Sequence, residues 1–415
     1  MPRFGISIYG VSRKIRTGEM TPISAFERIC RMGAEVVELV PFGFNLVETP
    51  ELKKDFKEAS RRLGVPIGNY SLNANFLMLT PEEYGREMAR VKQHIDMVSD
   101  MEIPTIRVDS AAYRRPMTEN TMEKFERCRE IAPLHTGPSI MGIQGCQAVM
   151  PDIPQAIVFD TVFHQTMPDY AYTYAIPYDV AEKYGIRRYG FHGTSHRYVS
   201  IEAAKMLGKP IEETKIITCH MGNGSSITAV KGGKCIDTSM GFTPLAGVEM
   251  GTRCGDIDPA VVTYIMKKEG YTPDEMDNYM NKKCGFLGLS GVSSDSRDVE
   301  NAITEGNEHA RISADVLGYQ TKKYIGSYAA AMDGVDAIVF TAGMGENNPM
   351  LRERACKDLS YLGIEIDQEI NYATIKKPEG VEISTPNSKV KVLVIPTNEE
   401  LMIARETEAL IKATK

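Results

Sequence analysis

Four polar side chains lie beside apolar runs or glycine-rich turns, where an enzyme can hold reacting groups in a cleft. Asp160 ends the apolar run in "VFDTVFHQTMP", residues 158–168. His192 and His196 lie in the glycine-rich stretch "RRYGFHGTSH", and Arg253 stands between small residues in "DTSMGFTPLAGVEMGTRCGDIDP". A carboxylate in such a place can orient an acceptor or a metal ion, and an arginine can stabilise a transferring anionic group.

Two glycine-rich loops each follow an apolar run. In "CHMGNGSSITAV", residues 219–230, the apolar stretches 216–219 and 227–230 predict paired strands. The loop between them predicts a hairpin tip whose backbone N–H groups can wrap an anion, because glycine lets the backbone approach phosphate oxygens closely. In "AIVFTAGMGEN", residues 337–347, a buried strand precedes a second glycine loop. An ordinary turn is the alternative for each loop taken alone.

Two further stretches complete a pattern that fits phosphoryl transfer. "SGVSSDSRD", residues 290–298, is a polar turn, and "VLVIPTNEE", residues 392–400, is an apolar strand followed by two carboxylates. Together the motifs supply anion cradles, a cation, an orienting carboxylate and a possible Mg²⁺ ligand, which are the parts that phosphoryl transfer needs. The chain contains no G-x-x-x-x-G-K-[ST] sequence, so it is not a P-loop enzyme.

Each of these residues also has a purely structural interpretation. Asp160 could cap a helix, and Arg253 could be a surface charge. His192 and His196 have the i, i+4 spacing of a metal-binding pair, but the Gly-Thr-Ser between them makes a regular helix improbable. We therefore do not expect a zinc site there, and hydrogen bonding within a loop is the simpler alternative.

The composition limits the class of protein. The chain has 415 residues, 42% apolar and 25% charged, which predicts a soluble globular protein of two or more domains. The net charge of −7 gives no reason to expect nucleic acid as a partner. No apolar run is long enough to span a membrane, and no signal peptide is evident. The eight cysteines are scattered without a C-x-x-C pair, which favours a reducing cytoplasm.

The first 130 residues or so alternate strand and helix in the manner of a parallel sheet. The clearest helix is 81–100, with Pro81 at its first position and Thr80 and Glu83 as a capping box. This part resembles about four of the eight units in the sugar-phosphate isomerase/epimerase barrels. Glu38 and Asp109 lie near strand ends, but we expect them to be ordinary polar residues. The predicted strands are 4–10, 36–40, 66–72 and 105–110.

The residue pattern changes abruptly within residues 126–138, and the rest of the chain resembles the acetate kinase family. That family belongs to the superfamily of acetate and sugar kinases, heat-shock ATPases and actin. The resemblance runs from about residue 132 to 415 and rests on motifs that occur in the family's order. These are "MGIQGCQAVMP", "FDTVFHQTMP", "RRYGFHGTSHRYVS", "CHMGNGSS", "DTSMGFTPLAGVEMGTRCGDIDP", "FTAGMGEN" and "VLVIPTNEELMIAR".

The resemblance implies a role for each matching residue. Asp160 would face acetate, and His192 and Arg253 would stabilise the transferring phosphoryl group. Glu399 would bind Mg²⁺ or Mn²⁺. The methyl pocket for acetate would be lined by Leu134, Phe191 and Pro244. ATP or ADP would be held by His220, Met221, Gly222, Asn223, Gly224, Asp295, Ser296, Arg297, Gly343, Met344, Gly345, Glu346 and Asn347.

The N-terminal part of the chain differs from the family in its motifs. The family opens with a strand and an Asn-Ala-Gly-Ser-Ser-Ser loop that contacts phosphate and Mg²⁺, and a later arginine binds the substrate carboxylate. Residues 1–130 carry neither motif; Arg107 is the nearest arginine, but its context does not match. Ser296 replaces a larger residue, and Thr136-Gly137 replaces the usual Asn-Pro. We therefore expect impaired activity.

These observations predict an α/β chain made of a partial (β/α) barrel, 1–130, and an actin-like, ribonuclease H-like kinase part, 131–415. The kinase part would comprise a main lobe, 162–399, and remnants of the first lobe, 132–161 and 400–415. The leading function is transfer of phosphate from ATP to acetate by a cytoplasmic homodimer joined through its C-terminal lobes. The alternatives are a propionate kinase, a non-catalytic nucleotide-binding protein and, less favoured, a metal-dependent sugar-phosphate isomerase.

Overall fold

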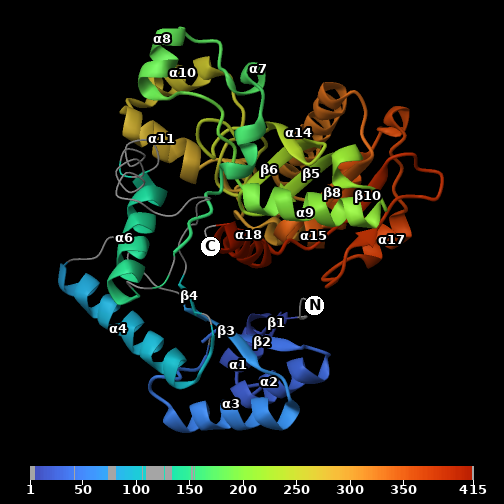
Figure 1. The fold of residues 1–415 in the computed structure, drawn as a ribbon. Coiled ribbons are helices and arrows are strands. Elements are labelled where there is room, and N and C mark those ends of the chain that lie inside the picture. Colours follow the sequence, from blue (N-terminus) through green and yellow to red (C-terminus); the bar gives the residue numbers. More distant parts are fainter. Residues whose placement is uncertain are drawn as a thin grey trace. The chain divides into compact units, whose positions relative to one another are not determined.

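The computed structural model describes residues 5–41, 43–72, 81–104, 106–108, 126, 133–150, 153 and 155–413. Its internal contacts divide the chain into two compact units, Met1–Ile157 and Val158–Lys415. Each unit has its own sheet (Figure 1). Buried apolar residues form one cluster in the first unit and two in the second. The division by contacts thus falls after Ile157, whereas the division expected from the family resemblance, after residue 130, stays a prediction.

The first unit is built on a parallel sheet whose strands follow one another in chain order. A strand forms in each of the four predicted places, and the helix predicted at 81–100 is present. A partial barrel is not confirmed, because parallel strands in chain order also occur in open sheets. The strands are β1 (Gly5–Ser7), β2 (Val36–Leu39), β3 (Ile67–Leu72) and β4 (Ile106–Val108). The helices are η1 (Ile8–Val11), α1 (Ser12–Arg16), α2 (Pro22–Arg31), α3 (Pro50–Leu63), α4 (Pro81–Asp100) and α6 (Pro133–Val149).

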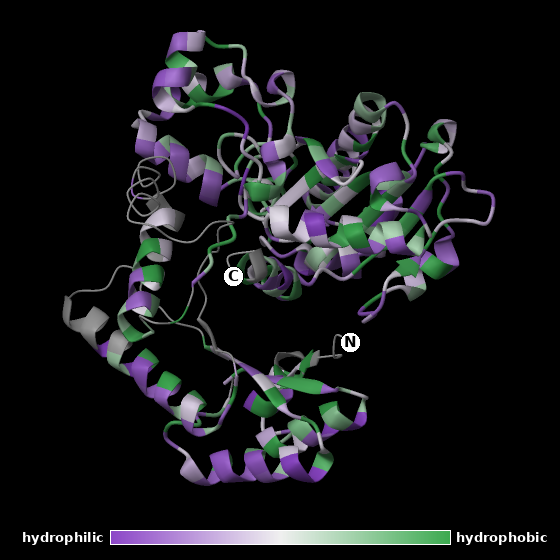
Figure 2. Cartoon of the chain, viewed as in Figure 1, coloured by the Kyte–Doolittle hydropathy of each residue, from purple (hydrophilic) through white to green (hydrophobic). Residues whose placement is uncertain are grey.

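Local sequence signals explain these helices. Thr21 caps α2 by accepting a hydrogen bond from the Ser24 amide, and Gly64 ends α3 in the left-handed conformation, φ 67°. Figure 2 shows α3 as mostly hydrophilic, so the helix packs against the rest of the unit through a narrow apolar side. Phe56 of that side meets Phe26 of α2 edge to face, with ring centroids 5.6 Å apart.

Glu38 accepts hydrogen bonds from a neighbouring strand of the first unit. Its Oε1 accepts hydrogen bonds from Asn69 Nδ2 at 2.7 Å and from Ser71 Oγ at 2.5 Å. These contacts join β2 to β3 across the sheet and fit the expectation that Glu38 is an ordinary polar residue. Asp109 and the cap residue Thr80 lie outside the described residues.

The second unit is built on the mixed sheet β7-β6-β5-β8-β10-β9. The predicted hairpin is confirmed: β5 and β6 pair antiparallel with Cys219 opposite Ile227, and residues 222–224 form the tip. The predicted strand before the second glycine loop is β8, which runs parallel to β5. The strands are β5 (Lys215–Met221), β6 (Ser225–Lys231), β7 (Lys234–Thr238), β8 (Ala337–Thr341), β9 (Val381–Glu382) and β10 (Lys391–Val394).

Helices cover both faces of this sheet, and alternate residues of β5 face opposite ways. Ile217 and Cys219 enter the core that contains residues of α14, whereas Ile216 enters the core that contains residues of α9. Among the described residues, no helix is long and apolar enough to cross a membrane. The helices are η2 (Val162–Thr166), α7 (Asp169–Tyr172), α8 (Tyr178–Tyr184), α9 (Gly193–Met206), η3 (Ile211–Glu213), α10 (Pro259–Glu269), α11 (Pro273–Lys282), α12 (Gly285–Ser290), α13 (Ser296–Thr304), α14 (Glu308–Met332), α15 (Ala342–Asn347), α16 (Pro349–Cys356), η4 (Ser360–Leu362), α17 (Gln368–Ala373) and α18 (Glu399–Ala413).

A buried arginine ties the second glycine loop to the helices behind it. Arg352 of α16 is fully buried, and its guanidinium donates hydrogen bonds to the carbonyl oxygens of Gly345, Asn371 and Thr374 at 2.8–2.9 Å. It also donates to the side-chain oxygen of Asn371 at 2.8 Å. Burial lowers the pKa of Arg352 to about 10, which leaves the group charged at neutral pH. One side chain therefore satisfies several carbonyl groups that water cannot reach.

We expect Arg352→Met to destabilise the second unit by about 2–4 kcal/mol, because methionine fills a similar volume but leaves buried carbonyl oxygens without donors. Urea denaturation followed by circular dichroism measures the effect. The matched control is Arg311→Met, which removes only exposed ion pairs with Glu308 and Asp315 and should hardly move the midpoint. Equal shifts for the two variants would contradict this account.

Candidate functional site

The two glycine loops lie side by side because β5 and β8 are parallel neighbours. His220 pairs with Thr341 at the carboxyl ends of the two strands. The hairpin tip starts at Gly222, whereas residues 342–347, expected to form a second glycine loop, form the short helix α15 directly after β8. A Cβ placed on Gly222 would lie 3.7 Å from the Cβ of Ala342. Ligands of open α/β sheets bind at the carboxyl ends of parallel strands. The structure thus brings both predicted anion loops to one edge of the sheet.

The polar turn before α13 reaches the same edge. A Cβ placed on Gly251 would lie 2.1 Å from Asn223 Oδ1 and 3.0 Å from the Ser294 carbonyl oxygen, so Gly251 leaves the space that the hairpin tip occupies. A small cleft is lined by both Ser296 and Met344. The three segments predicted to hold a nucleotide, 220–224, 295–297 and 343–347, therefore converge in the second unit.

The residues of these segments differ in what they can offer a ligand. Met221 and Met344 are buried in the hydrophobic core, so only their main-chain groups could contact a nucleotide. Glu346 Oε1 already accepts hydrogen bonds from the amides of Ala342 at 2.9 Å and Thr397 at 3.2 Å. Glu346 therefore holds α15 against the segment that follows β10. Burial raises the pKa of Glu346 despite these donors.

The other nucleotide-segment residues are more open. Asn223, Gly343 and Asn347 are exposed, and Asn347 Nδ2 donates to the Gly343 carbonyl oxygen at 2.9 Å. Arg297, with 85% of its side chain exposed, pairs with Asp295 at 2.5 Å, and this hydrogen bond is the main reason that the pKa of Asp295 is lowered. The guanidinium of Arg297 thus points from the turn into solvent, where a ligand could reach it.

His192 and Arg253 flank Gly224 at the tip of the hairpin, and Asp160 is joined to the main chain at His192. The His192 amide donates to Asp160 Oδ2 at 2.7 Å, and the Gly193 amide donates to the Asp160 carbonyl oxygen at 2.8 Å. A Cβ placed on Gly224 would lie 3.3 Å from His192 Nε2 and 3.4 Å from Arg253 Nη1. The absence of a side chain on Gly224 leaves this space open beside an imidazole and a guanidinium.

Arg253 supplies a partly buried positive charge. Its Nη1 donates to the Pro244 carbonyl oxygen at 3.0 Å, and no carboxylate among the described residues forms an ion pair with it. Burial lowers the pKa of Arg253 from its ordinary value near 12.5. Arginine nevertheless stays protonated at neutral pH in proteins. A cation held in this way is suited to an anionic ligand.

The expectation that "HGTSH" would not form a regular helix was wrong. His192 adopts the left-handed conformation, φ 58°, as the residue before α9, and the helix starts at Gly193 and includes His196. Packing on the sheet outweighs the weak helix propensity of Gly, Thr and Ser. Both histidines contact the same hydroxyl, Ser226 Oγ, at 2.8 Å and 2.7 Å. Among the described residues, no group of three His, Cys, Asp or Glu could hold a metal ion.

Four histidines gather here, and burial lowers the pKa of all of them. The pKa of His192 falls to about 3, with a smaller contribution from nearby Arg253, and that of His164 falls to about 4. The pKa values of His196 and His220 are also far below the ordinary value. The four rings are therefore neutral at physiological pH and act through hydrogen bonds rather than through charge.

The residues expected to line a methyl pocket are only partly brought together. The Phe191 carbonyl oxygen lies 2.9 Å from His164 Nε2, and Pro244 contacts Arg253 through its own carbonyl oxygen, so both flank the site. Leu134 belongs to α6 of the first unit, and its side chain lies outside the described residues. Glu399 is the partly buried first residue of α18 and follows closely on Thr397.

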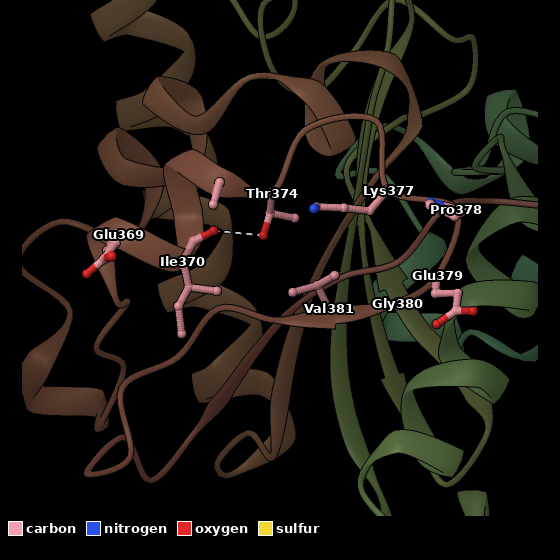
Figure 3. A pocket seen from close by; sticks show the side chains of 9 residues that line it. Glu369, Ile370, Thr374, Lys377, Pro378, Glu379, Gly380 and Val381 are labelled. Carbon is pink, nitrogen blue, oxygen red and sulfur yellow. Dashed lines mark hydrogen bonds between the residues drawn. The ribbon is translucent and has the colours of Figure 1, made fainter.

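A separate groove of about 450 Å³ lies between α17 and β9. Figure 3 shows Thr374 donating to the Ile370 carbonyl oxygen at one side of it and Lys377 extending toward it. None of the predicted site residues is among those that line this groove. Sequence reasoning missed instead the hydroxyl residues Ser195, Thr218, Ser226 and Thr397, although the first and third stand inside the motifs "HGTSH" and "GNGSS".

Comparison with known proteins identifies the family. The sequence profile of the acetokinase family matches residues 110–405 and so starts earlier than the resemblance that begins near residue 132. Acetate kinase of Moorella thermoacetica is 57% identical over 294 residues, which are 71% of this chain and 73% of that protein.

Solved structures agree with this match. The crystal structure of acetate kinase from Porphyromonas gingivalis superimposes with a TM-score of 0.74 at 44% identity and covers 78% of this chain and 84% of that one. The crystal structure of a propionate kinase from Francisella tularensis gives a TM-score of 0.67 at 36% identity and covers 88% of this chain and 85% of that one. The α/β fold of this chain is therefore the fold of these kinases.

Glu249 lies in the loop that carries Arg253, and its burial predicts that the stability of the fold depends on pH. Glu249 is buried; its Oε1 accepts a hydrogen bond from Ser313 Oγ at 2.7 Å, and its Oε2 has no hydrogen-bond partner among the described residues. Burial raises the pKa of Glu249 to about 8, so the folded state holds a proton that the unfolded chain releases above about pH 4.5. Its contribution to stability therefore falls as pH rises from about 4.5 to 8.

We expect Glu249→Gln to remove this fall, so that the variant gains stability over the parent chain as pH rises, by up to a few kcal/mol at pH 8. Thermal unfolding at pH 5, 6, 7 and 8 measures the difference in Tm. Glu305→Gln on the exposed surface is the control and should give the same difference at every pH. A pH-independent difference for Glu249→Gln would show that the buried carboxyl is not protonated.

Proposed function

This chain belongs to the acetokinase family and is an ATP-dependent carboxylate phosphotransferase of the acetate kinase type, and we propose that acetate is its acceptor. The products would be ADP and acetyl phosphate. The observation that supports this proposal best is the placement of His192 and Arg253 beside Gly224, with Asp160 joined to the main chain at His192, next to the converged nucleotide segments. The non-catalytic and isomerase alternatives have no comparable support.

The nucleotide would be bound by 220–224, 295–297 and 343–347. The open space at Gly224 would admit the terminal phosphoryl group, because any side chain there would meet His192 and Arg253. Arg253 would then stabilise the charge of the group in transfer, and His192 would donate a hydrogen bond to it. Asp160, fixed by the His192 amide, would orient the acceptor opposite the phosphoryl group.

Metal binding is proposed for Glu399. Mg²⁺ takes few protein carboxylates and keeps several waters, and a single partly buried glutamate near the site fits that preference. When bound with the nucleotide, Mg²⁺ or Mn²⁺ would neutralise charge on the phosphate oxygens. The absence of a cluster of three ligands among the described residues is compatible with such a site, because the nucleotide supplies the remaining oxygens.

Propionate is the second candidate acceptor, because a propionate kinase matches 88% of this chain at 36% identity. Phe191 and Pro244 flank the site and would contact the acyl group, together with Leu134. We also propose that the functional division falls after residue 130, that the kinase parts of two chains pair as a homodimer, and that the protein works in the cytoplasm. The scattered cysteines of the sequence, which contain no C-x-x-C pair, favour that compartment.

Arg253→Ala should lower kcat by about 100-fold or more while changing the affinity for ATP only a few-fold, because a cation that meets developing charge acts mainly in the transition state. Arg297→Ala is the contrasting variant: its exposed guanidinium should affect nucleotide affinity more than kcat. Steady-state kinetics and ADP titration calorimetry on both variants separate the two effects. Equal losses of kcat and affinity in Arg253→Ala would indicate a plain binding role.

We expect slow turnover with intact nucleotide binding, because residues 1–130 carry neither the phosphate-contacting loop nor the carboxylate-binding arginine of the family. A substrate carboxylate that binds without its cation loses its hydration, and little interaction energy replaces it. A misplacement of the reacting groups by ~1 Å can cost ~100-fold in rate. Hydroxamate trapping of the acyl phosphate from ATP, Mg²⁺ and either acetate or propionate is the assay. A relative that carries both motifs is the reference, and an equal rate would refute this expectation.

A further inference from the structure

His192 and His220 form a stacked pair beside the hairpin tip. Their ring centroids are 4.0 Å apart and their planes differ by 16°. The Nε2 atom of His192 lies 3.3 Å from a Cβ placed on Gly224, and the Nε2 atom of His220 lies 3.9 Å from a Cβ placed on Gly222. Both rings thus turn the same nitrogen toward the glycines of the tip, and their Nδ1 atoms contact hydroxyl groups inside the protein.

The hydroxyl beside His220 has only one direction in which to donate. Thr397 Oγ1 donates to Ser195 Oγ at 2.8 Å, and Ser195 Oγ lies 2.8 Å from His220 Nδ1. Since Ser195 accepts from Thr397, its own proton is available for His220 Nδ1. In a neutral imidazole one nitrogen accepts and the other carries the proton. The contacts therefore place the proton of His220 on Nε2.

A longer chain of contacts leads to His192. Ser226 Oγ lies between His192 Nδ1 at 2.8 Å and His196 Nε2 at 2.7 Å, and its single proton can serve only one of them. The contact at His196 Nδ1 decides which of the two nitrogens accepts the proton of Ser226. His196 Nδ1 lies 2.7 Å from Thr218 Oγ1, whose only other described acceptor, the Thr228 carbonyl oxygen, is 3.5 Å away.

Thr218 therefore donates to His196, since 3.5 Å is at the limit of a hydrogen bond and 2.7 Å is close to the optimum. His196 then carries its proton on Nε2 and donates to Ser226. Ser226 in turn donates to His192 Nδ1, which leaves the proton of His192 on Nε2. Thr218, Ser226 and His196 are buried, so water cannot easily reverse the order.

We propose that two hydrogen-bond relays, Thr218–His196–Ser226 and Thr397–Ser195, set the tautomers of His192 and His220 so that both present Nε2–H donors to a terminal phosphoryl oxygen. The identity of that ligand rests on the proposed function, whereas the tautomers do not. The opposite tautomer would turn a lone pair toward the anion and repel it. Thr218, Ser226, Ser195 and Thr397 are positioning residues, because they act through the two rings.

The low pKa values of both rings agree with this arrangement. Burial is the main reason that the pKa of His192 is about 3 and that the pKa of His220 is far below its ordinary value. A ring that is neutral throughout the working pH range has a single N–H, so its tautomer decides whether it attracts or repels an anion. A permanently charged imidazolium would carry both protons and would need no relay.

The test is ¹⁵N NMR of the full chain labelled at histidine, with resonances assigned through His192→Gln and His220→Gln. Protonated and unprotonated ring nitrogens have distinct shifts, so the spectrum reports each tautomer directly. We expect His192, His196 and His220 all to carry the proton on Nε2. Finding His192 or His220 protonated on Nδ1 in the parent chain would overturn the proposal, and this measurement needs no relay variant to fold and no turnover.

Thr218→Val tests the longer relay, because it keeps the shape of the side chain and removes its O–H. His196 Nδ1 then meets neither a donor nor an acceptor, so the relay no longer favours one order, and we expect His196 and His192 each to populate both the Nε2–H and the Nδ1–H form. His220 should stay unchanged, because its relay is separate. Thr218→Ser, which restores the hydroxyl, should restore the parent pattern. An unchanged His192 tautomer in Thr218→Val would overturn the role assigned to Thr218.

The same variants give a kinetic readout wherever turnover is measurable. We expect Thr218→Val to lower kcat by about two- to fivefold with little change in the KM for ATP, and Thr218→Ser to recover most of the loss. A loss shared equally by kcat and KM would contradict a tautomer effect. Because the NMR result does not depend on activity, failure of the proposed kinase function and failure of the relays are distinguishable.

Discussion

Parallel pairing of β5 with β8 is the constraint on which the rest of the site depends. The pair His220–Thr341 brings two strand ends to one edge of the sheet, and one glycine segment follows each end. The antiparallel pairing of β5 with β6 then returns the chain to the same place and delivers Ser226 beneath His192. Without this backbone arrangement, neither the open space at Gly224 nor the contacts around it would exist.

A charged group and neutral hydrogen-bond donors have separate roles at the hairpin tip. Arg253 carries the positive charge at the hairpin tip, while the histidines beside it are kept neutral by burial. An imidazolium next to a guanidinium would be repelled, whereas a neutral imidazole can donate a hydrogen bond without that cost. The buried hydroxyl groups satisfy the inner nitrogens of the rings, as burial of polar atoms requires. The outer nitrogens are then left for a ligand.

The sequence predicted those parts of the fold that follow from local patterns. Apolar runs around a glycine tip predicted the hairpin of β5 and β6, and alternating strand and helix signals predicted the parallel sheet of the first unit. The start of α9 was missed, because Gly193, Thr194 and Ser195 are weak helix formers that tertiary packing overrides. The partnership of Ser195 with Thr397 joins residues 202 positions apart, and no local pattern encodes such a contact.

The register of β5 against β6 has a consequence for how this region tolerates insertions and deletions. Thr218 and His220 alternate along β5 with Cys219 and Met221, so the polar contacts near the end of the strand lie on the α9 side, and Cys219 and Met221 lie in the core on the other side. Sliding the strand by one residue against its neighbours would exchange the two rows. A single codon gained or lost within β5 would therefore place the polar side chains in the core beside α14 and the apolar ones against α9. In this hairpin a change of length is therefore more disruptive than a substitution that keeps the alternation.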